Sequence, residues 1–287
     1  MTIVVTGATG QLGRRVVEAL LARGVAAGDV VAAVRSPQKA AGFAARGVQV
    51  READYDRPET LRAAVAGADK LLLISSNALE RKIIQHRSVI DSAKAVGVEL
   101  IAYTSALDAQ LNPMIIAADH KATEHLLAAS GLRYAVLRNG WYAENYTQNL
   151  AEVRDSGVIV GSAADGRIAA APRADYAEAA AAVLTSDGGG GSTFYELGGD
   201  EPFTMTELAA QIARQTGEPV TYRNLPVGEY IRTLVGSGLP AEQAALVADS
   251  DLAVSRGFMT TDSGDLRRLI GRPSTPLADT IATALAA

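Results

Sequence analysis

Apolar and polar positions along the first half of the chain follow two alternating patterns. Short, almost continuous apolar runs such as "TIVVT" (2–6) are typical of strands that are buried on both faces. The stretches between these runs carry apolar stripes at helical spacing, as in 11–23. The predicted strands are 2–6, 29–35, 47–54, 69–75, 98–105 and 133–138, and the predicted helices between them are 11–23, 36–46, 58–66, 80–96 and 119–130. This alternation predicts an α/β fold with a Rossmann-type, doubly wound parallel sheet.

The pattern changes after Arg138. A polar and aromatic stretch, "NGWYAENYTQNL", comes next, and the glycine run at 188–192 is short enough to be a loop rather than a domain linker. Further short segments are expected at 157–160 and 167–171, a helix at 173–186, a strand at 193–199, and helices at 204–216, 226–236, 240–255 and 262–270. We therefore expect a Rossmann domain over 1–138 and 173–199, with a small, mainly helical lobe over 139–172 and 200–287.

The composition narrows the class of protein. The chain has 287 residues, 48% of them hydrophobic, which is enough for a large core. Its net charge of −5, with no Lys/Arg run longer than a pair, argues against a nucleic-acid partner. The absence of cysteine excludes disulfides and thiolate catalysis, and with only His86, His120 and His125 no metal site is expected. A strand at the very start leaves no room for a signal peptide, and no apolar run reaches the ~18 residues of a membrane span, so we expect a cytoplasmic protein without a membrane partner.

Three glycines stand three residues apart directly after the first predicted strand. A glycine turn between a strand and a helix binds anions, because backbone N–H groups at the helix start point outward and the helix dipole favours negative charge. Gly7 would permit the tight turn, Gly10 would let a pyrophosphate approach the backbone, and Gly13 would let helix and strand pack closely. We expect a dinucleotide here, although the spacing is GxxGxxG rather than the commoner GxGxxG. The expected contacts are Gly7, Ala8, Thr9, Gly10, Gln11, Leu12 and Gly13.

The end of the second predicted strand indicates which dinucleotide binds. NAD sites place Asp or Glu there to bind the ribose hydroxyls, whereas this strand ends in "AVRSPQK", with Arg35 and no carboxylate. A guanidinium binds a 2′-phosphate in bidentate fashion, so NADPH is expected to bind more tightly than NADH. Asp54, after the third predicted strand, would either touch the adenine side or cap the helix that follows.

Several phrases of the sequence together carry a family resemblance. They are "VTGATGQLG", "VRSPQKA", "READYDRPETL", "KLLLISS", "LIAYTSA", "LRNGWYAENY" and "PRADYA", and they extend over nearly the whole chain. The chain resembles the atypical short-chain dehydrogenases of the NmrA-like group, and within it the bacterial NADPH:quinone oxidoreductase 2 type. The resemblance implies NADPH in the Rossmann domain, a substrate-binding lobe, and two-electron reduction of a quinone. It also implies that Leu73, Ile74, Ser75 and Arg173 line the cofactor.

The usual proton donor of short-chain dehydrogenases is missing. Those enzymes protonate their substrate with a Tyr that stands four residues before a Lys. Here Lys121 has Ala117 at that place, and no Tyr occurs between Tyr103 and Tyr134. A quinone substrate would not need this Tyr. Hydride addition to a quinone leaves a delocalised hydroquinone anion, which takes a proton from water. Lys121 would either reach the nicotinamide ribose or lie on a solvated helix face.

The stretch "NGWYAENY" follows the sixth predicted strand at its C-terminal end, where open α/β sheets bind ligands. Asn139 offers an amide to the nicotinamide carboxamide or to a quinone. Trp141 and Tyr142 offer flat apolar walls, or else pack in the core. The candidate catalytic residues are Asn139, Trp141, Tyr142 and Lys121, and the cofactor is also expected to touch Asn139, Gly140, Trp141 and Tyr142.

Two other functions stay open at this point. A non-catalytic, NADP(H)-sensing regulator of the NmrA type would also lack the catalytic Tyr, but it has no need of an aromatic-walled cleft. A reductase of triphenylmethane or azo dyes would favour an acidic residue such as Glu144 beside the pocket. The sequence is also compatible with a homodimer.

Overall fold

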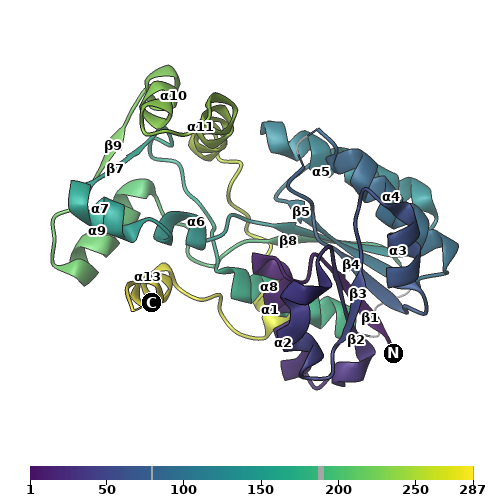
Figure 1. The fold of residues 1–287 in the computed structure, drawn as a ribbon. Coiled ribbons are helices and arrows are strands. Elements are labelled where there is room, and N and C mark those ends of the chain that lie inside the picture. The colour runs from purple at the N-terminus through teal and green to yellow at the C-terminus, as the bar shows by residue number, and fades with distance from the viewer. Residues whose placement is uncertain (79, 187–190, 287) are drawn as a thin grey trace.

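Seven parallel strands form the central sheet, in the order β3-β2-β1-β4-β5-β6-β8 (Figure 1). The computed structural model describes residues 1–78, 80–186 and 191–286. The strands are β1 (Ile3–Thr6), β2 (Val30–Val34), β3 (Gln49–Glu52), β4 (Lys70–Leu73), β5 (Leu100–Ala106), β6 (Tyr134–Asn139) and β8 (Thr193–Leu197). The strand order reverses between β1 and β4, as in a doubly wound Rossmann sheet, so the predicted fold class is confirmed.

Helices cover both faces of this sheet (Figure 1). One face carries α1 (Gln11–Ala22) and α8 (Arg173–Thr185), and the other carries α3 (Pro58–Val65), α4 (Lys82–Ala95) and α5 (Ile115–Ser130). Ile3 and Val5 of β1 belong to the core beneath α1 and α8, while Val4 belongs to the opposite core. Neighbouring residues of a strand therefore face different cores, which explains why the strands are apolar throughout.

Most predicted elements lie within a few residues of the observed ones, but two helices differ. The predicted helix 36–46 is a 3-10 turn, Pro37–Ala40, followed by the short α2 (Ala41–Ala44). Helix α5 begins at Ile115 rather than at 119, and the Ile115 N–H donates to Asp249 Oδ2 at 2.7 Å. That partner is far away in the chain, so the local pattern could not show it. Residues 188–190 of the predicted glycine loop lie outside the described residues.

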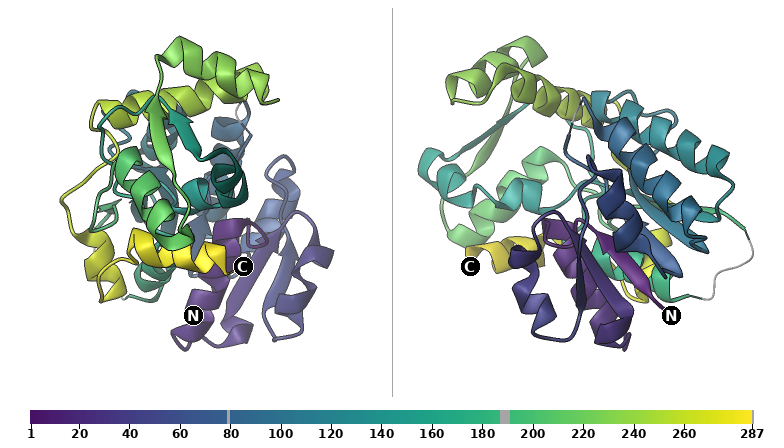
Figure 2. Two further views of the ribbon diagram at one scale, coloured as in Figure 1. Left: turned by 90° about the vertical axis from the view of Figure 1, so that its left-hand side faces the viewer. Right: turned by 45° about the vertical axis from the view of Figure 1, so that its right-hand side comes forward.

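A second lobe is built around a separate pair of parallel strands, β7 (Val158–Gly161) and β9 (Thr221–Asn224). Figure 2 shows this pair set apart from the main sheet. The helices of the lobe are α6 (Glu144–Thr147), α7 (Leu150–Ser156), α9 (Met205–Thr216), α10 (Val227–Gly236), α11 (Ala241–Ser255) and α13 (Leu277–Leu285). The sequence pattern did not predict β9, α6, α7 or α13. Strand β9 is largely exposed, so no apolar alternation marks it.

Helix α12 (Asp265–Ile270) departs from the expected division of the chain. Its Leu266 is fully buried in the core shared by α1 and α8, together with Leu197 of β8. The prediction assigned all of 200–287 to the second lobe, but this helix packs on the main sheet. The polypeptide returns to the Rossmann domain here because the apolar face of α12 packs against α8 rather than against the second lobe.

Candidate cofactor site and active site

Strands β1 and β4 separate at their carboxyl ends, and one side chain bridges them. Thr6 Oγ1 donates to Leu72 O at 2.9 Å and accepts from the Ile74 N–H at 3.0 Å. The crossovers from these two strands run in opposite directions along the sheet, which makes this the topological switch point. Dinucleotides bind in the crevice at such points of open α/β sheets.

The glycine turn lies directly above this switch point. Gly7 has φ +59°, a backbone conformation that favours glycine. A Cβ added to Gly13 would lie 2.3 Å from Gly7 O, so only glycine lets α1 approach the turn this closely. Gly10, at the start of α1, has φ −73°, no side chain caps the helix, and no acidic residue stands in its first turn. The first N–H groups of α1 are therefore available to an anion, in keeping with a pyrophosphate site.

The ends of β2 and β3 carry the residues expected at the adenosine half. Arg35 follows β2 directly and is exposed. Asp54 has local contacts instead: Oδ1 accepts from the Asp56 N–H at 3.0 Å, and Oδ2 lies 3.5 Å from Nε of Arg57. Asp54 thus organises the turn before α3, but it does not cap that helix, which begins after Arg57 without a side-chain cap.

The segment after β4 is held by side chains from three other elements. Tyr55 Oη donates to Ile74 O at 3.1 Å, the Ser75 N–H donates to Thr104 Oγ1 at 2.9 Å, and the Ser76 N–H donates to His86 Nε2 at 3.0 Å. Sequence patterns did not identify Tyr55, Thr104 or His86 as contributors. The sequence offered one signal for them, the pair of serines after an apolar strand. Where a strand ends, its backbone N–H and C=O groups need hydrogen-bond partners from other elements.

Leu73, Ile74 and Ser75 differ in what they can offer a ligand. The Leu73 side chain is fully buried in the core beneath α3, α4 and α5, so only its backbone could meet a cofactor. Ile74 and Ser75 are partly exposed. The backbone at 74–76 is therefore the part of this predicted contact that is presented at the edge of the sheet.

Two buried histidines behind this segment are neutral. Burial lowers the pKa of both His86 and His120 to about 3. Because His86 Nε2 accepts from Ser76, its proton resides on Nδ1, which donates to Thr123 Oγ1 at 2.9 Å. His120 Nδ1 lies 2.8 Å from the hydroxyl of Tyr103, and burial raises the pKa of that phenol above its ordinary value. None of these three groups can release a proton readily near neutral pH.

Asn139 ends β6 at the same edge of the sheet. The residue is buried, and its Oδ1 has no hydrogen-bond partner among the described residues. A buried amide oxygen without a partner costs free energy unless a ligand supplies a donor. Gly140 is packed instead: its N–H donates to Leu197 O at 2.7 Å, and an added Cβ would lie 2.8 Å from Tyr176 Oη.

Trp141 and Tyr142 pack against two different cores, which is the core-packing alternative of the sequence analysis. Tyr142 packs against the core of α1 and α8, edge-on to Tyr176 with 5.5 Å between ring centroids. Trp141 packs against the core of the second lobe. The two neighbours belong to different layers because the chain crosses from sheet to lobe here, where Tyr142 forms a bridge with Ala171. At the carboxyl end of β6, the Trp141 side chain therefore belongs to the second lobe and the Tyr142 side chain to the Rossmann domain.

Arg173, at the start of α8, is already engaged. Its guanidinium lies 4.3 Å from the ring centroid of Tyr142 and 3.3 Å from Glu144 Oε2, and it donates to Asn145 Oδ1 at 3.1 Å. Glu144 also accepts the Arg173 N–H at 3.0 Å. The acidic residue that a dye reductase would use to attract a cation is therefore paired with an arginine.

The hydrogen bond of Lys121 goes to a residue outside the candidate set. Lys121 is exposed, and its Nζ donates to Gln110 O at 3.2 Å. Ala117, which stands at the place of the usual Tyr, is fully buried in the core of the second lobe. Helix α5 turns His120 and Thr123 toward the sheet instead. Of the two alternatives for Lys121, its contacts are those of a residue on an exposed helix face.

Comparison with known proteins agrees with this arrangement. A family model described as NAD(P)H-binding matches residues 7–187. The chain belongs to the NAD(P)H-binding family. Quinone oxidoreductase 2 of Escherichia coli is 48% identical to it over 97% of each chain. The crystal structure of the Escherichia coli NADPH-dependent quinone oxidoreductase complexed with NADPH matches with a TM-score of 0.96 and 47% identity, covering 99% of this chain and 100% of that one.

A second solved relative is the triphenylmethane reductase of Citrobacter, complexed with NADP(H). It matches with a TM-score of 0.94 and 37% identity, covering 99% of this chain and 100% of that one. The family resemblance carried by the sequence phrases is confirmed by these matches.

The residues at this edge fit the dinucleotide that the family binds. The uncapped start of α1 and the open approach to Gly10 suit a pyrophosphate. The unpartnered Oδ1 of Asn139 suits an amide donor, such as the carboxamide of a nicotinamide. Both features belong to this chain's own geometry.

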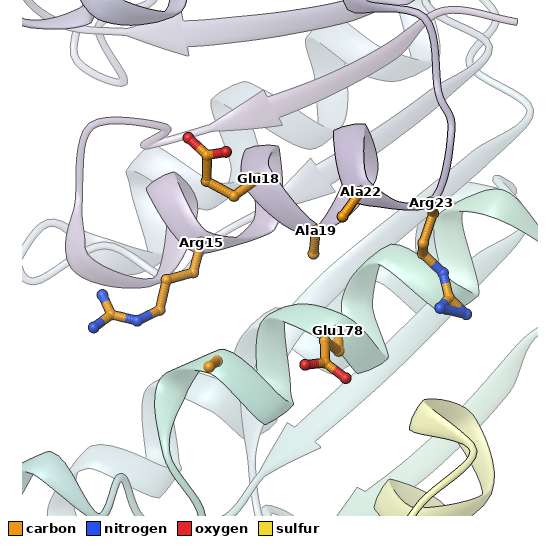
Figure 3. Close-up of a pocket in the computed structure, with 7 residues that line it drawn as sticks. Arg15, Glu18, Ala19, Ala22, Arg23 and Glu178 are labelled. Carbon is orange, nitrogen blue, oxygen red and sulfur yellow. The ribbon is translucent and has the colours of Figure 1, made fainter. Parts of the chain in front are cut away.

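A groove lies elsewhere, along the later turns of α1 and the start of α8 (Figure 3). Its lining residues are Arg15, Glu18, Ala19, Ala22, Arg23, Ala174 and Glu178. None of the predicted cofactor or catalytic residues lines this groove, so it is distinct from the candidate site.

Within residues 1–78, 80–186 and 191–286, two features bear on the class of site. No three His, Asp or Glu side chains gather there in a way that could hold a metal ion. No helix in the part of the chain that the structure describes is long and apolar enough to cross a membrane.

Proposed function

We propose that this protein is an NADPH-dependent oxidoreductase that transfers hydride directly to a quinone. The observation that carries the proposal is the chemistry of α5: Ala117 is buried where a catalytic Tyr would stand, and Lys121 contacts Gln110. The site thus lacks the acid that reduction of a ketone requires. The activity of its relative from Escherichia coli, an NADPH-dependent quinone oxidoreductase at 47% identity, supports the same conclusion.

Different residues would bind the different parts of the cofactor. The glycine turn would hold the pyrophosphate, Arg35 the 2′-phosphate, and the backbone at 74–76 together with Asn139 the nicotinamide half. When bound, NADPH supplies a hydride. The clamp of Tyr55, Thr104 and His86 on residues 74–76 keeps that part of the edge in one conformation before the cofactor arrives. Such preorganisation lowers the entropic cost of aligning two reactants.

The proton for the product would come from water. The Tyr103 phenol is buried with a raised pKa, and His120 is neutral with its pKa lowered to about 3. Burial makes Tyr103 a weaker acid than an ordinary phenol, and His120 carries no imidazolium proton at neutral pH. A quinone tolerates this, because the anion formed by hydride addition is an aromatic hydroquinone. One hydride and one proton from solvent together convert the quinone into the hydroquinone.

The test is the oxidation of NADPH by the purified protein, followed by absorbance with and without a simple benzoquinone. We expect oxidation only when the quinone is present, with one hydroquinone formed for each NADPH consumed. A protein that binds NADPH but oxidises none with benzo- or naphthoquinones would refute the proposal. That result would favour the regulator that senses NADP(H).

A further inference from the structure

Arg14, in the first turn of α1, reaches back to the glycine turn. Its Nη2 donates to Thr9 O at 3.2 Å, in keeping with the tilt of helical side chains toward the start of their helix. The residue is exposed, and this single bond leaves most of the N–H groups of the guanidinium unused. A cationic group that can bind an anion therefore lies against the turn where the cofactor is expected.

The glycine turn is joined to β2 at this point. The Ala8 N–H donates to Ala33 O of β2 at 3.4 Å. Thr9, whose carbonyl oxygen holds Arg14, is the next residue after Ala8. Arg35 follows Ala33 by two residues, directly after the carboxyl end of β2. Arg14 and Arg35 therefore approach the same side of the turn, the side of the adenosine half, from two different elements.

The carboxylate that could neutralise Arg14 on its own helix is occupied. Glu18 is the only acidic residue of α1 and stands four residues after Arg14, a spacing at which helical side chains can pair. Its carboxylate instead forms a salt bridge with Arg46, which lies between α2 and β3. Within the part of the chain that the structure describes, Arg14 forms no salt bridge.

The carboxylate beside Arg35 is occupied in the same way. Glu52 of β3 is in register with Val34, the residue before Arg35, and it forms a salt bridge with Arg57. Arg35 is exposed and has no ion-pair partner among the described residues. The positive charges of Arg14 and Arg35 are thus both left uncompensated at the adenosine side of the turn.

We propose that Arg14 binds the 2′-phosphate of NADPH together with Arg35. This inference rests on the proposed function, which it deepens by adding a second residue that distinguishes NADPH from NADH. A phosphate monoester carries about two negative charges near neutral pH, and its oxygens accept charge-assisted bonds from guanidinium groups. The ribose hydroxyl of NADH offers neither arginine a charged acceptor. The bond to Thr9 O holds Arg14 in place before the cofactor arrives, which lowers the entropic cost of binding.

The experiment measures Kd by calorimetric titration for two pairs of ligands that differ only in the 2′-phosphate: NADPH with NADH, and 2′,5′-ADP with 5′-AMP. We expect Arg14→Ala to weaken NADPH and 2′,5′-ADP about tenfold and to leave NADH and 5′-AMP unchanged. A variant with both Arg14→Ala and Arg35→Ala should bind NADPH no more tightly than NADH. The matched control is Arg15→Ala, which should change no Kd. Arg15 is exposed as well, but its Nη1 donates to Gln11 O and it lines the groove between α1 and α8 (Figure 3).

Two outcomes overturn the inference. An unchanged Kd for NADPH in Arg14→Ala would show that this residue does not touch the cofactor. Equal weakening of NADPH and NADH would assign Arg14 to the pyrophosphate or to support of the turn. Arg14→Gln, which removes the charge but keeps an N–H donor for Thr9 O, should show the same selective loss as Arg14→Ala.

Failure of the proposed function gives a different result. A wild-type protein that binds NADPH but transfers no hydride to a quinone would refute the quinone reductase, while the Kd values would still test Arg14. Loss of the fold is recognised by thermal unfolding of each variant, and Arg14→Gln and Arg14→Ala are compared only if both unfold near the wild-type temperature.

Discussion

The backbone N–H of Ser76 donates to Nε2 of His86 at 3.0 Å. This bond joins the segment after β4 to the interior of α4, where His86 is fully buried. The same serine is held a second time, because its Oγ donates to Gln85 Oε1 at 2.6 Å. One turn of α4 thus fixes the edge of the sheet where the nicotinamide half of a cofactor is expected.

Replacing His86 should therefore weaken the binding of the whole dinucleotide but not of its adenosine half. His86→Leu leaves the Ser76 N–H without an acceptor, at a cost of about 1–3 kcal/mol. We expect the Kd for NADPH to rise about tenfold, while 2′,5′-ADP, which lacks the nicotinamide half, binds as before. Calorimetric titration measures both values.

Two variants control that experiment. His86→Gln keeps an acceptor near the position of Nε2 and should restore most of the NADPH affinity. His125→Leu changes an exposed histidine on α5 and should have no effect. Equal weakening of NADPH and 2′,5′-ADP by His86→Leu would instead indicate a general loss of folding.

Arg35 should decide the preference between the two nicotinamide cofactors. A charge-assisted bond to the 2′-phosphate is worth about 1–3 kcal/mol, so wild type should bind NADPH more tightly than NADH by roughly tenfold to a hundredfold. Arg35→Ala should remove most of this difference by weakening NADPH alone. Equal affinities in wild type would show that Arg35 does not read the 2′-phosphate.

A side chain added at Gly13 should reduce stability, whereas a side chain added at Gly10 should reduce cofactor affinity. An added Cβ at Gly13 would lie 2.3 Å from Gly7 O, so Gly13→Ala should lower the free energy of unfolding by several kcal/mol. At Gly10 the nearest atom would be 3.1 Å away and φ is −73°, so Gly10→Val should fold but lose NADPH affinity. Urea denaturation and titration of both variants separate the two effects. A folded Gly10→Val protein with unchanged affinity would argue against a pyrophosphate at this turn.

The neutral histidines predict a loss of stability in acid. Burial lowers the pKa of His86 and His120 to about 3, from an ordinary value of 6.5. Between these values the unfolded chain binds protons that the folded chain does not. The free energy of unfolding is therefore highest above about pH 6.5, and it falls by about 1.4 kcal/mol per pH unit for each histidine as the pH decreases. Urea denaturation at several pH values measures this slope.

The control for the acid slope is His86→Gln, which should lose about half of it. Asp251 acts in the opposite sense, because burial raises its pKa to about 6 and the folded chain retains a proton that the unfolded chain releases. Asp251 contributes equally to the slopes of wild type and variant. The difference between the two slopes therefore reports on His86 alone. Identical slopes would mean that His86 does not titrate on unfolding.

Lys121 and Asn139 should differ sharply in their effect on turnover. Lys121→Ala should change neither kcat nor the Kd for NADPH, because Nζ is exposed and donates to the backbone oxygen of Gln110. Asn139→Leu should lower kcat/KM for a quinone by about tenfold or more, because it removes the amide that has an unpartnered oxygen at the site. Steady-state kinetics check both. A large loss with Lys121→Ala would restore the classical role of this lysine.

Local features of the sequence determined the fold class and the place of the cofactor turn. Residues of β1 alternate between two cores, so every residue of this strand is buried. The resulting apolar run identifies the strand from the sequence alone, without knowing which residues pack against it. The separation of Gly7 and Gly13 is likewise a local requirement, since the atoms that exclude a Cβ at Gly13 belong to Gly7 and Ala8. Strand β9 escaped prediction because it is largely exposed. Helix α12 was predicted as a helix but was expected in the second lobe, because the core that places it is distant in the chain.

Only the tertiary structure decided how the candidate site is assembled. The sequence placed Trp141 and Tyr142 after a strand, but the crossing of the chain between sheet and lobe sends them into different cores. It marked Ser75 as a candidate, while the groups that hold this segment, from Thr104 and His86, come from other elements. The sequence offered Lys121 as a candidate without its usual Tyr, and in the folded chain its Nζ donates to Gln110 O. Hydrogen bonds between separate elements depend on packing, and no periodicity along the chain records them.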